Sequence, residues 1–197
     1  GLVVPPAVAP IQAVIVPVAA HKGGVMEKCE ELFAELKASG IRVKLDDRDT
    51  LSPGFKFNDW ELKGVPVRIE IGPRDVENGQ CVVFRRDTYE KQSVALTELG
   101  TMLPGLLEDI QRNMYAIADA FRGERIAVAH DMEALASAVD GGFAKAMWCG
   151  ERACEDEIKE KLGASSRNMP FDQTPVGETC VCCGKKADKV IYFAKAY

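Results

Sequence analysis

Two pairs of cysteines near the end of the chain have the spacing of a metal site. Cys149 and Cys154 form the first pair, and Cys180 and Cys183 form the second, which reads C-x-x-C-G-K. The glycine of the second pair permits a tight turn in which backbone N–H groups face the thiolate sulfurs. Four thiolates close a tetrahedral site around Zn²⁺ and leave no position for water or substrate. The pattern therefore predicts a structural Zn²⁺ ion, with iron as the alternative metal.

The choice of ligand within the second pair stays open. Cys182 directly precedes Cys183, so a Cys180-x-Cys182 pair would also bring two thiolates together. We assign Cys183 because it completes the two-residue spacing and precedes the glycine. Cys29 and Cys81 each stand alone in an apolar pattern and are expected to be buried core residues. The simpler interpretation of the paired cysteines is likewise that they are buried apolar residues and not metal ligands. An odd total of seven, with four in close pairs, favours metal binding in a reducing compartment over a disulfide framework.

A second group of residues has the chemistry to recognise a nucleic-acid base. Phe57 and Glu61 are spaced one helical turn apart, so a helix would place an aromatic ring beside a carboxylate. A carboxylate accepts hydrogen bonds from the N1–H and N2–H₂ groups of guanine, while an aromatic ring stacks on an unpaired base. Charged residues nearby could complete such a site: Asp46, Arg48, Lys56, Arg68, Arg74 and Asp75.

Each of these residues also has a simpler interpretation. Phe57 and Trp60 are compatible with a hydrophobic core, and residues 46–48 with a solvated turn. The acidic residues lack the spacing of a calcium loop. The sequence has no phosphate-binding loop and no triad of nucleophile, base and acid, and its two histidines, His21 and His130, are isolated. These patterns therefore favour binding over catalysis.

The base-recognition residues are expected to lie in an α/β domain with a mixed, mostly parallel sheet flanked by helices. A nearly continuous apolar run predicts a central strand buried on both faces, and the helix and strand after it complete a right-handed βαβ unit. A short helix and an antiparallel edge hairpin, turned at Asn78-Gly79, follow. In chain order these elements are expected at 11–18, 24–39, 41–45, 55–63, 67–71 and 81–85.

A long amphipathic helix is expected from 93 to 121, with a kink or break at Pro104-Gly105. The second half is predicted to be a small α+β domain that needs a metal because its core is small. We place the boundary near residue 122, which gives domains at 1–122 and 123–197. The second domain is expected to contain strands at 126–129, 143–148 and 190–194, helices at 132–139 and 151–162, and an irregular stretch at 163–179.

Composition restricts how the chain could bind RNA. Its 197 residues are 47% hydrophobic and 28% charged, which is typical of folded domains, and the net charge is −5. Uniform phosphate binding needs an excess of Lys and Arg, so any RNA binding must come from a local patch with base contacts. No apolar run reaches the roughly 20 residues of a membrane helix, and no secretory signal opens the chain. We therefore expect a cytoplasmic protein that does not enter a membrane.

The first half of the chain resembles the anticodon-binding domain of class IIa aminoacyl-tRNA synthetases. The residues that carry this resemblance are Leu2–Gln12, Lys44–Arg48, Pro53–Lys56, Trp60–Pro66 and Arg68–Asp75. The second half resembles the zinc domain appended to prolyl-tRNA synthetases of the archaeal and eukaryotic type. Here the residues are Trp148–Gly150, Cys154-Glu155, Arg167, Pro170-Phe171 and Ala194–Tyr197. The two resemblances cover essentially the whole chain, and the second narrows the family to proline.

The resemblance implies roles that spacing does not give. Five positions contact the anticodon guanines and their backbone in this family: Phe57, Glu61, Arg68, Arg74 and Asp75. Lys is also usual at the position of Arg74, and Ala7 stands where the family often has a basic residue, a change that would weaken a backbone contact. The family further implies that the terminal carboxylate of Tyr197 packs toward the catalytic domain.

The resemblance also implies partners and cofactors. The expected partners are tRNA(Pro), through its anticodon loop, and the N-terminal catalytic domain of the same enzyme, a homodimer at full length. Class II catalytic motifs are absent, so this part alone is expected to be inactive. ATP and Mg²⁺ belong to the catalytic domain, which forms prolyl-adenylate and attaches proline to tRNA. Two alternatives remain open: a stand-alone tRNA-binding paralogue without catalysis, and a zinc-stapled protein-interaction module without an RNA ligand.

Overall fold

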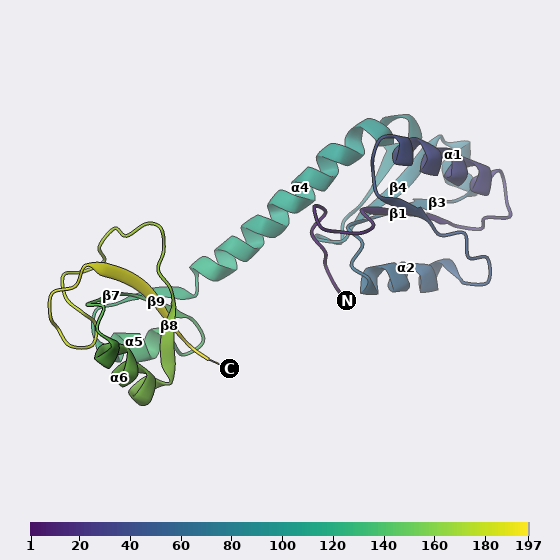
Figure 1. Ribbon diagram of the computed structural model, residues 1–197. Coiled ribbons are helices and arrows are strands. Elements are labelled where there is room, and N and C mark those ends of the chain that lie inside the picture. Colours follow the sequence, from purple (N-terminus) through teal and green to yellow (C-terminus); the bar gives the residue numbers. More distant parts are fainter. Residues whose placement is uncertain (197) are drawn as a thin grey trace. The chain divides into compact units, whose positions relative to one another are not determined.

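The computed structural model describes residues 1–196. The chain forms two compact units, which divide between Ile117 and Ala118 (Figure 1). Each unit has its own sheet and its own hydrophobic core. The helix α4, Leu96–Gly123, contains the point of division. The predicted fold class, an α/β domain followed by a small α+β domain, is confirmed.

The sheet of the first unit has five strands in the order β2-β1-β3-β4-β5. Strand β1 (Ala13–Pro17) lies between β2 (Val43–Leu45) and β3 (Val67–Ile71) and runs parallel to both. All of β1 is buried, as its apolar run predicts. Strands β4 (Gln80–Arg85) and β5 (Lys91–Ala95) extend the sheet in antiparallel pairing.

Helices cover the two faces of this sheet unequally. α1 (Val25–Ala38) and the first half of α4 pack on one face, in the cluster that contains Ile15. α2 (Pro53–Leu62) packs on the other face, where Trp60 joins Val14 of β1 (Figure 1). On this second face the side chains at the β5 edge are exposed to solvent. An open area of sheet therefore lies beside α2.

The connection from β3 to β4 differs from the predicted tight hairpin. The two strands are antiparallel as expected, but a short helix, α3 (Pro73–Glu77), joins them, and Gly79 turns the chain with a φ of 64°. The pair is also interior to the sheet and not at its edge, because β5 pairs with β4. Residues 93–95, predicted as the start of the long helix, belong to β5. The sequence of β5 is mostly polar, so pairing with β4, and not apolar alternation, decides its conformation.

Helix α4 continues through Pro104. Of the predicted kink or break at this position, the break does not occur. Proline removes a backbone hydrogen bond from a helix interior. Leu99, Leu103 and Leu107 of α4 are buried against the sheet, on both sides of the proline. Burial of these apolar side chains outweighs the loss of the hydrogen bond.

The second unit contains a four-stranded sheet in the order β6-β7-β9-β8. β6 and β7 are parallel, and the other pairs are antiparallel. The strands are β6 (Ile126–Ala129), β7 (Phe143–Trp148), β8 (Ala164–Asn168) and β9 (Lys189–Lys195). β8 falls in the stretch predicted to be irregular. Its sequence, Ala-Ser-Ser-Arg-Asn, has no apolar alternation, and pairing with β9 makes it a strand.

Helices α5 (Met132–Ala138) and α6 (Arg152–Leu162) complete the second unit. Leu135 and Ile158 from these helices pack with Phe193 of β9 in a fully buried cluster. Within residues 1–196, no helix has the length and apolar composition needed to cross a membrane. Tyr197, whose carboxylate was expected to face a catalytic domain, lies outside the described residues.

Candidate nucleic-acid interface and metal centre

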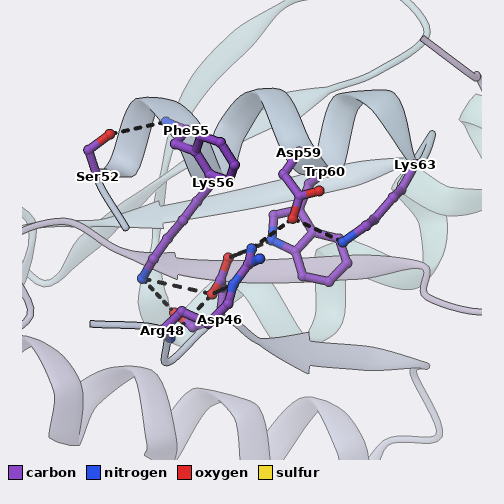
Figure 2. A network of polar contacts seen from close by, with 8 residues as sticks. All are labelled: Asp46, Arg48, Ser52, Phe55, Lys56, Asp59, Trp60 and Lys63. Atoms are coloured by element: carbon purple, nitrogen blue, oxygen red, sulfur yellow. Dashed lines mark hydrogen bonds and ion pairs between the residues drawn. The ribbon is translucent and has the colours of Figure 1, made fainter. Parts of the chain in front are cut away.

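A polar network ties the loop after β2 to helix α2 (Figure 2). Asp46 directly follows β2, and its carboxylate accepts hydrogen bonds from Trp60 Nε1 at 2.7 Å and Arg48 Nη2 at 2.6 Å. Lys56 Nζ donates to the backbone carbonyl of Asp46 at 3.0 Å. Arg48 also reaches Asp59 on α2, at 2.9 Å. Asp46 and Arg48 of the loop are therefore each bonded to side chains of α2, and the loop is held against the helix.

The network keeps its central carboxylate ionised. Burial alone would raise the pKa of Asp46, but hydrogen bonds from Arg48 and Trp60 and the charge of Lys56 lower it to about 2. The side chains of Asp46 and Lys56 are themselves buried. The sequence grouped both with RNA-contacting residues, yet in the structure their polar groups are partners of the network. Arg48, with 37% of its side chain exposed, can still reach a ligand.

Arg68 organises the predicted base-recognition residues. Its guanidinium carbon lies 4.2 Å from the ring centroid of Phe57 and 4.1 Å from that of Phe84. Its Nη1 donates to Glu61 Oε1 at 2.7 Å, and its Nε donates to Glu70 Oε1 at 3.0 Å. Two carboxylates and two rings therefore surround one cation that is only 5% exposed.

This arrangement leaves a carboxylate and a ring at the surface of α2. Phe57 and Glu61 lie on the same side of the helix, and both are partly exposed. The Glu61 side chain keeps 31% exposure while Arg68 binds one of its oxygens. A carboxylate held in this way can accept hydrogen bonds from the edge of a base, and the neighbouring ring offers an apolar surface for stacking.

Arg74 and Asp75 lie on α3, just past the carboxyl end of β3. Asp75 Oδ2 accepts a hydrogen bond from the Gly72 backbone N–H at 2.8 Å and thereby caps the helix. Arg74 is exposed. Arg68 stands near the start of β3, so it lies at the other end of this strand from Arg74 and Asp75, and the described hydrogen bonds and ion pairs include no direct contact between them.

Sequence reasoning missed three residues of this cluster: Phe84, Glu70 and Lys91. Phe84 pairs with Arg68 across β3 and β4, and Lys91 pairs with Phe84 across β4 and β5. The alternation along β3 would have placed Glu70 on the same face as Arg68. Lys91 had no such signal, because its strand was not recognised.

Four cysteines converge in the second unit. The Sγ atoms of Cys149, Cys154, Cys180 and Cys183 lie within 4.8 Å of one another. Cys149 Sγ is 3.6 Å from Cys154 Sγ and 3.9 Å from Cys183 Sγ. A tetrahedral Zn²⁺ with Zn–S bonds of about 2.3 Å requires S···S distances of about 3.8 Å. Two of the distances are close to this value, and the four sulfurs are near enough to one another to form a tetrathiolate metal centre.

The turn of the second cysteine pair has the expected form. Gly184 adopts a φ of 69°, and its N–H donates to the Cys180 carbonyl at 2.9 Å. Burial alone would raise the pKa of Cys180, but backbone N–H groups of Cys183, Cys182 and Cys149 directed at its sulfur lower it to about 7. Among the described residues, the four-sulfur group includes Cys183 and not Cys182.

Comparisons with known proteins match both units. Residues 12–106 match the family described as anticodon binding domain, and residues 132–197 match prolyl-tRNA synthetase, C-terminal. The chain is 51% identical over 199 residues to the proline--tRNA ligase of Alkaliphilus oremlandii and 50% identical to proline--tRNA ligase 2 of Clostridioides difficile. It is 53% identical to the proline--tRNA ligase of Lachnoclostridium phytofermentans.

These matches cover 100% of this chain and 41% of each of the three relatives, so the chain spans less than half of their length. The two family matches lie in the same order as the two units of the fold, and the second contains all four cysteines of the metal centre. The chain therefore belongs to the prolyl-tRNA synthetase family, of which it carries the anticodon-binding domain and the C-terminal domain with its four-cysteine cluster.

Proposed function

We propose that this chain selects tRNA(Pro) by binding the guanines of its anticodon loop. The observation that carries the proposal is the partly exposed pair of Phe57 and Glu61, held by the buried Arg68 inside a unit that matches an anticodon-binding domain. Glu61 accepts hydrogen bonds from a guanine edge, and Phe57 supplies the stacking surface. Arg68 positions both side chains.

The other predicted residues take different parts in this proposal. Arg74 and Asp75 read a second base or its backbone from the end of β3, and Arg48 contacts a phosphate from its exposed side. Asp46 and Lys56 act indirectly, since their side chains are buried and fix the loop that carries Arg48. Uniform phosphate binding plays a small part because the net charge is −5.

The four cysteines are proposed to hold a structural Zn²⁺. A site with four protein thiolates has no open position for substrate, so the ion would stabilise the fold of the second unit and take no part in a reaction. Cys149 and Cys154 join the end of β7 to α6, while Cys180 and Cys183 belong to the loop before β9. The metal would therefore connect three segments of a unit with a small core.

At full length the protein is proposed to be a proline--tRNA ligase that attaches proline to tRNA(Pro), using ATP through a prolyl-adenylate. The catalytic domain, Mg²⁺ and the homodimer belong to that longer protein, which acts in the cytoplasm. The 197-residue chain alone is proposed to be inactive, because it lacks the class II catalytic motifs. A gene whose reading frame carries no such motifs before Gly1 would instead indicate a stand-alone tRNA-binding paralogue.

Binding measurements on tRNA test the anticodon proposal. The unmodified chain should bind a tRNA(Pro) transcript about tenfold more tightly than transcripts with substituted anticodon guanines, as expected for base contacts of about 1–3 kcal/mol. Glu61→Ala should remove most of this difference by weakening the cognate complex alone. Glu160→Ala, at an exposed position of α6, is the matched control. Equal affinity of the unmodified chain for all transcripts would favour a protein-interaction module.

A further inference from the structure

A row of side chains crosses the first sheet on the face that α2 covers only in part. The strand register places Val14, Arg68, Phe84 and Lys91 opposite one another across β1, β3, β4 and β5. Val14 lies beneath α2 in a small apolar cluster, whereas Lys91 lies on the edge strand. Residues that oppose each other in a sheet share a face. The row therefore leads from the buried side of α2 to the open edge.

Lys91 is the exposed cation at the end of this row. Its side chain is 49% exposed, and its Nζ lies 3.0 Å from Glu70 Oε1. The same Nζ lies 5.7 Å from the ring centroid of Phe57. Lys91 is therefore the neighbour of the proposed stacking surface, although it is far from Phe57 in sequence.

The two cations near Phe57 differ in exposure: Arg68 is buried and Lys91 is exposed. Arg68 is enclosed and is bound by Glu61 and Glu70, so its charge is balanced inside the protein. Lys91 shares Glu70 with Arg68, and the Lys91 side chain is 49% exposed whereas that of Glu70 is only 12% exposed. An ammonium that is half exposed gains little from such a pair and can bind a further anion on its open side. Lys91 thus keeps a charge that an incoming ligand can use.

We infer that Lys91 binds a phosphate of the RNA backbone next to the base held at Phe57, an inference that rests on the proposed anticodon function. A base stacked on this ring brings its own phosphate close to the ring, and the Lys91 ammonium lies 5.7 Å from the ring centroid. An ammonium group is a compact charge with three donors, which suits a phosphate oxygen and does not distinguish bases. Lys91 therefore supplies affinity, whereas Glu61 supplies selectivity.

The test is the salt dependence of tRNA binding by the 197-residue chain. Lys91→Ala should lower the affinity at low salt by about threefold to tenfold, equally for the tRNA(Pro) transcript and for transcripts with substituted anticodon guanines. It should reduce the slope of log K against log[KCl] by about 0.7 to 0.9, the value for one phosphate contact. Lys91→Arg should restore the slope because it keeps the charge.

Lys37→Ala provides the matched control. The Lys37 ammonium also lies over an aromatic ring, 5.6 Å from the centroid of Phe33, but it is on α1, which packs on the opposite face of the sheet. This variant should leave both the affinity and the slope unchanged. Circular dichroism of each variant checks that the first unit is folded. If Lys91→Ala does not fold, Lys91→Gln serves as a second variant without the positive charge.

The outcomes separate this inference from the function on which it rests. If the unmodified chain discriminates between anticodons but neither neutral variant changes the slope, Lys91 is only a surface ion pair and the inference fails alone. A loss confined to the cognate transcript would make Lys91 a base contact and would also overturn it. If the unmodified chain does not discriminate between anticodons, the proposed function fails, whatever Lys91 does.

Discussion

At the scale of single residues, a buried cation decides where the surface groups stand. A buried guanidinium loses hydration, and this cost is offset only when several groups satisfy it. Arg68 meets this condition with two carboxylates and two aromatic rings. The positions of Glu61 and Phe57 are therefore set by the needs of a third side chain, which itself has little contact with solvent.

The cysteine assignments lead to a prediction for two adjacent residues. Cys183→Ser should lose bound zinc, because the Cys183 sulfur lies in the four-sulfur group at 3.9 Å from Cys149 Sγ. Cys182→Ser should keep about one zinc ion per chain, since Cys182 is not a member of the four-sulfur group. The zinc content of the two purified variants, measured by plasma mass spectrometry, checks this prediction. Full zinc in Cys183→Ser together with loss in Cys182→Ser would reverse the assignment.

The sequence revealed those parts of the candidate sites that depend on local spacing. The proximity of Phe57 and Glu61 was predictable because they are one helical turn apart. The proximity of Cys180 and Cys183 was predictable because only two residues separate them. Burial of Lys56 was not predictable, because a lysine normally reads as a surface residue. Lys91 was missed because strand pairing, which the local pattern does not specify, brings it to Phe57.

At the scale of elements, packing against a neighbour decided the places where local preference was weak or contrary. β5 and β8 are polar segments that became strands through their partners, β4 and β9. α4 continues through a proline because its leucines are buried. By contrast, β1 and α1 were predictable, since their apolar patterns are strong and agree with the final burial.

Two glycines in α4 allow a matched prediction. Gly105→Ala should raise the free energy of unfolding of the first unit by about 0.5–1 kcal/mol, because alanine loses less conformational entropy in a helix. An added Cβ at Gly105 would meet nothing within 4 Å. Gly100→Ala should gain less, because the added Cβ would lie 2.7 Å from Glu35 Oε1 and would displace that side chain.

Urea denaturation of the two variants, followed by circular dichroism, measures the difference. A lower stability of Gly105→Ala than of the unmodified chain would contradict the prediction. It would mean that the helix needs the backbone freedom of glycine next to Pro104, where the chain lacks one hydrogen bond.

At the scale of the whole molecule, each unit depends on a different source of stability. The first has a large apolar core of sixteen buried residues drawn from strands and helices, whereas the second combines a smaller core with the cysteine group. A small core rarely stabilises a domain without a metal or a covalent link. Loss of metal should therefore affect the two units unequally.

Chelation provides the test. Removal of zinc should unfold or loosen residues 118–196, because structural zinc sites contribute directly to folding free energy. Residues 1–117 should keep their structure, since the cysteine group has no member there. Hydrogen exchange with and without chelator, read separately for the two units, measures the effect, and added Zn²⁺ should reverse it. Equal exchange increases in both units would show that their stabilities are not independent.

The Arg68 cluster has a consequence for how the first sheet can assemble. A strand that slides by one residue turns all its side chains to the opposite face. If β4 slid in this way against β3, Phe84 would leave the guanidinium, and an enclosed charge would lose one of the rings that cover it. An isolated buried charge is among the most costly defects in a folded protein. The cluster thus penalises misaligned pairing and makes a single alignment of these strands the stable one.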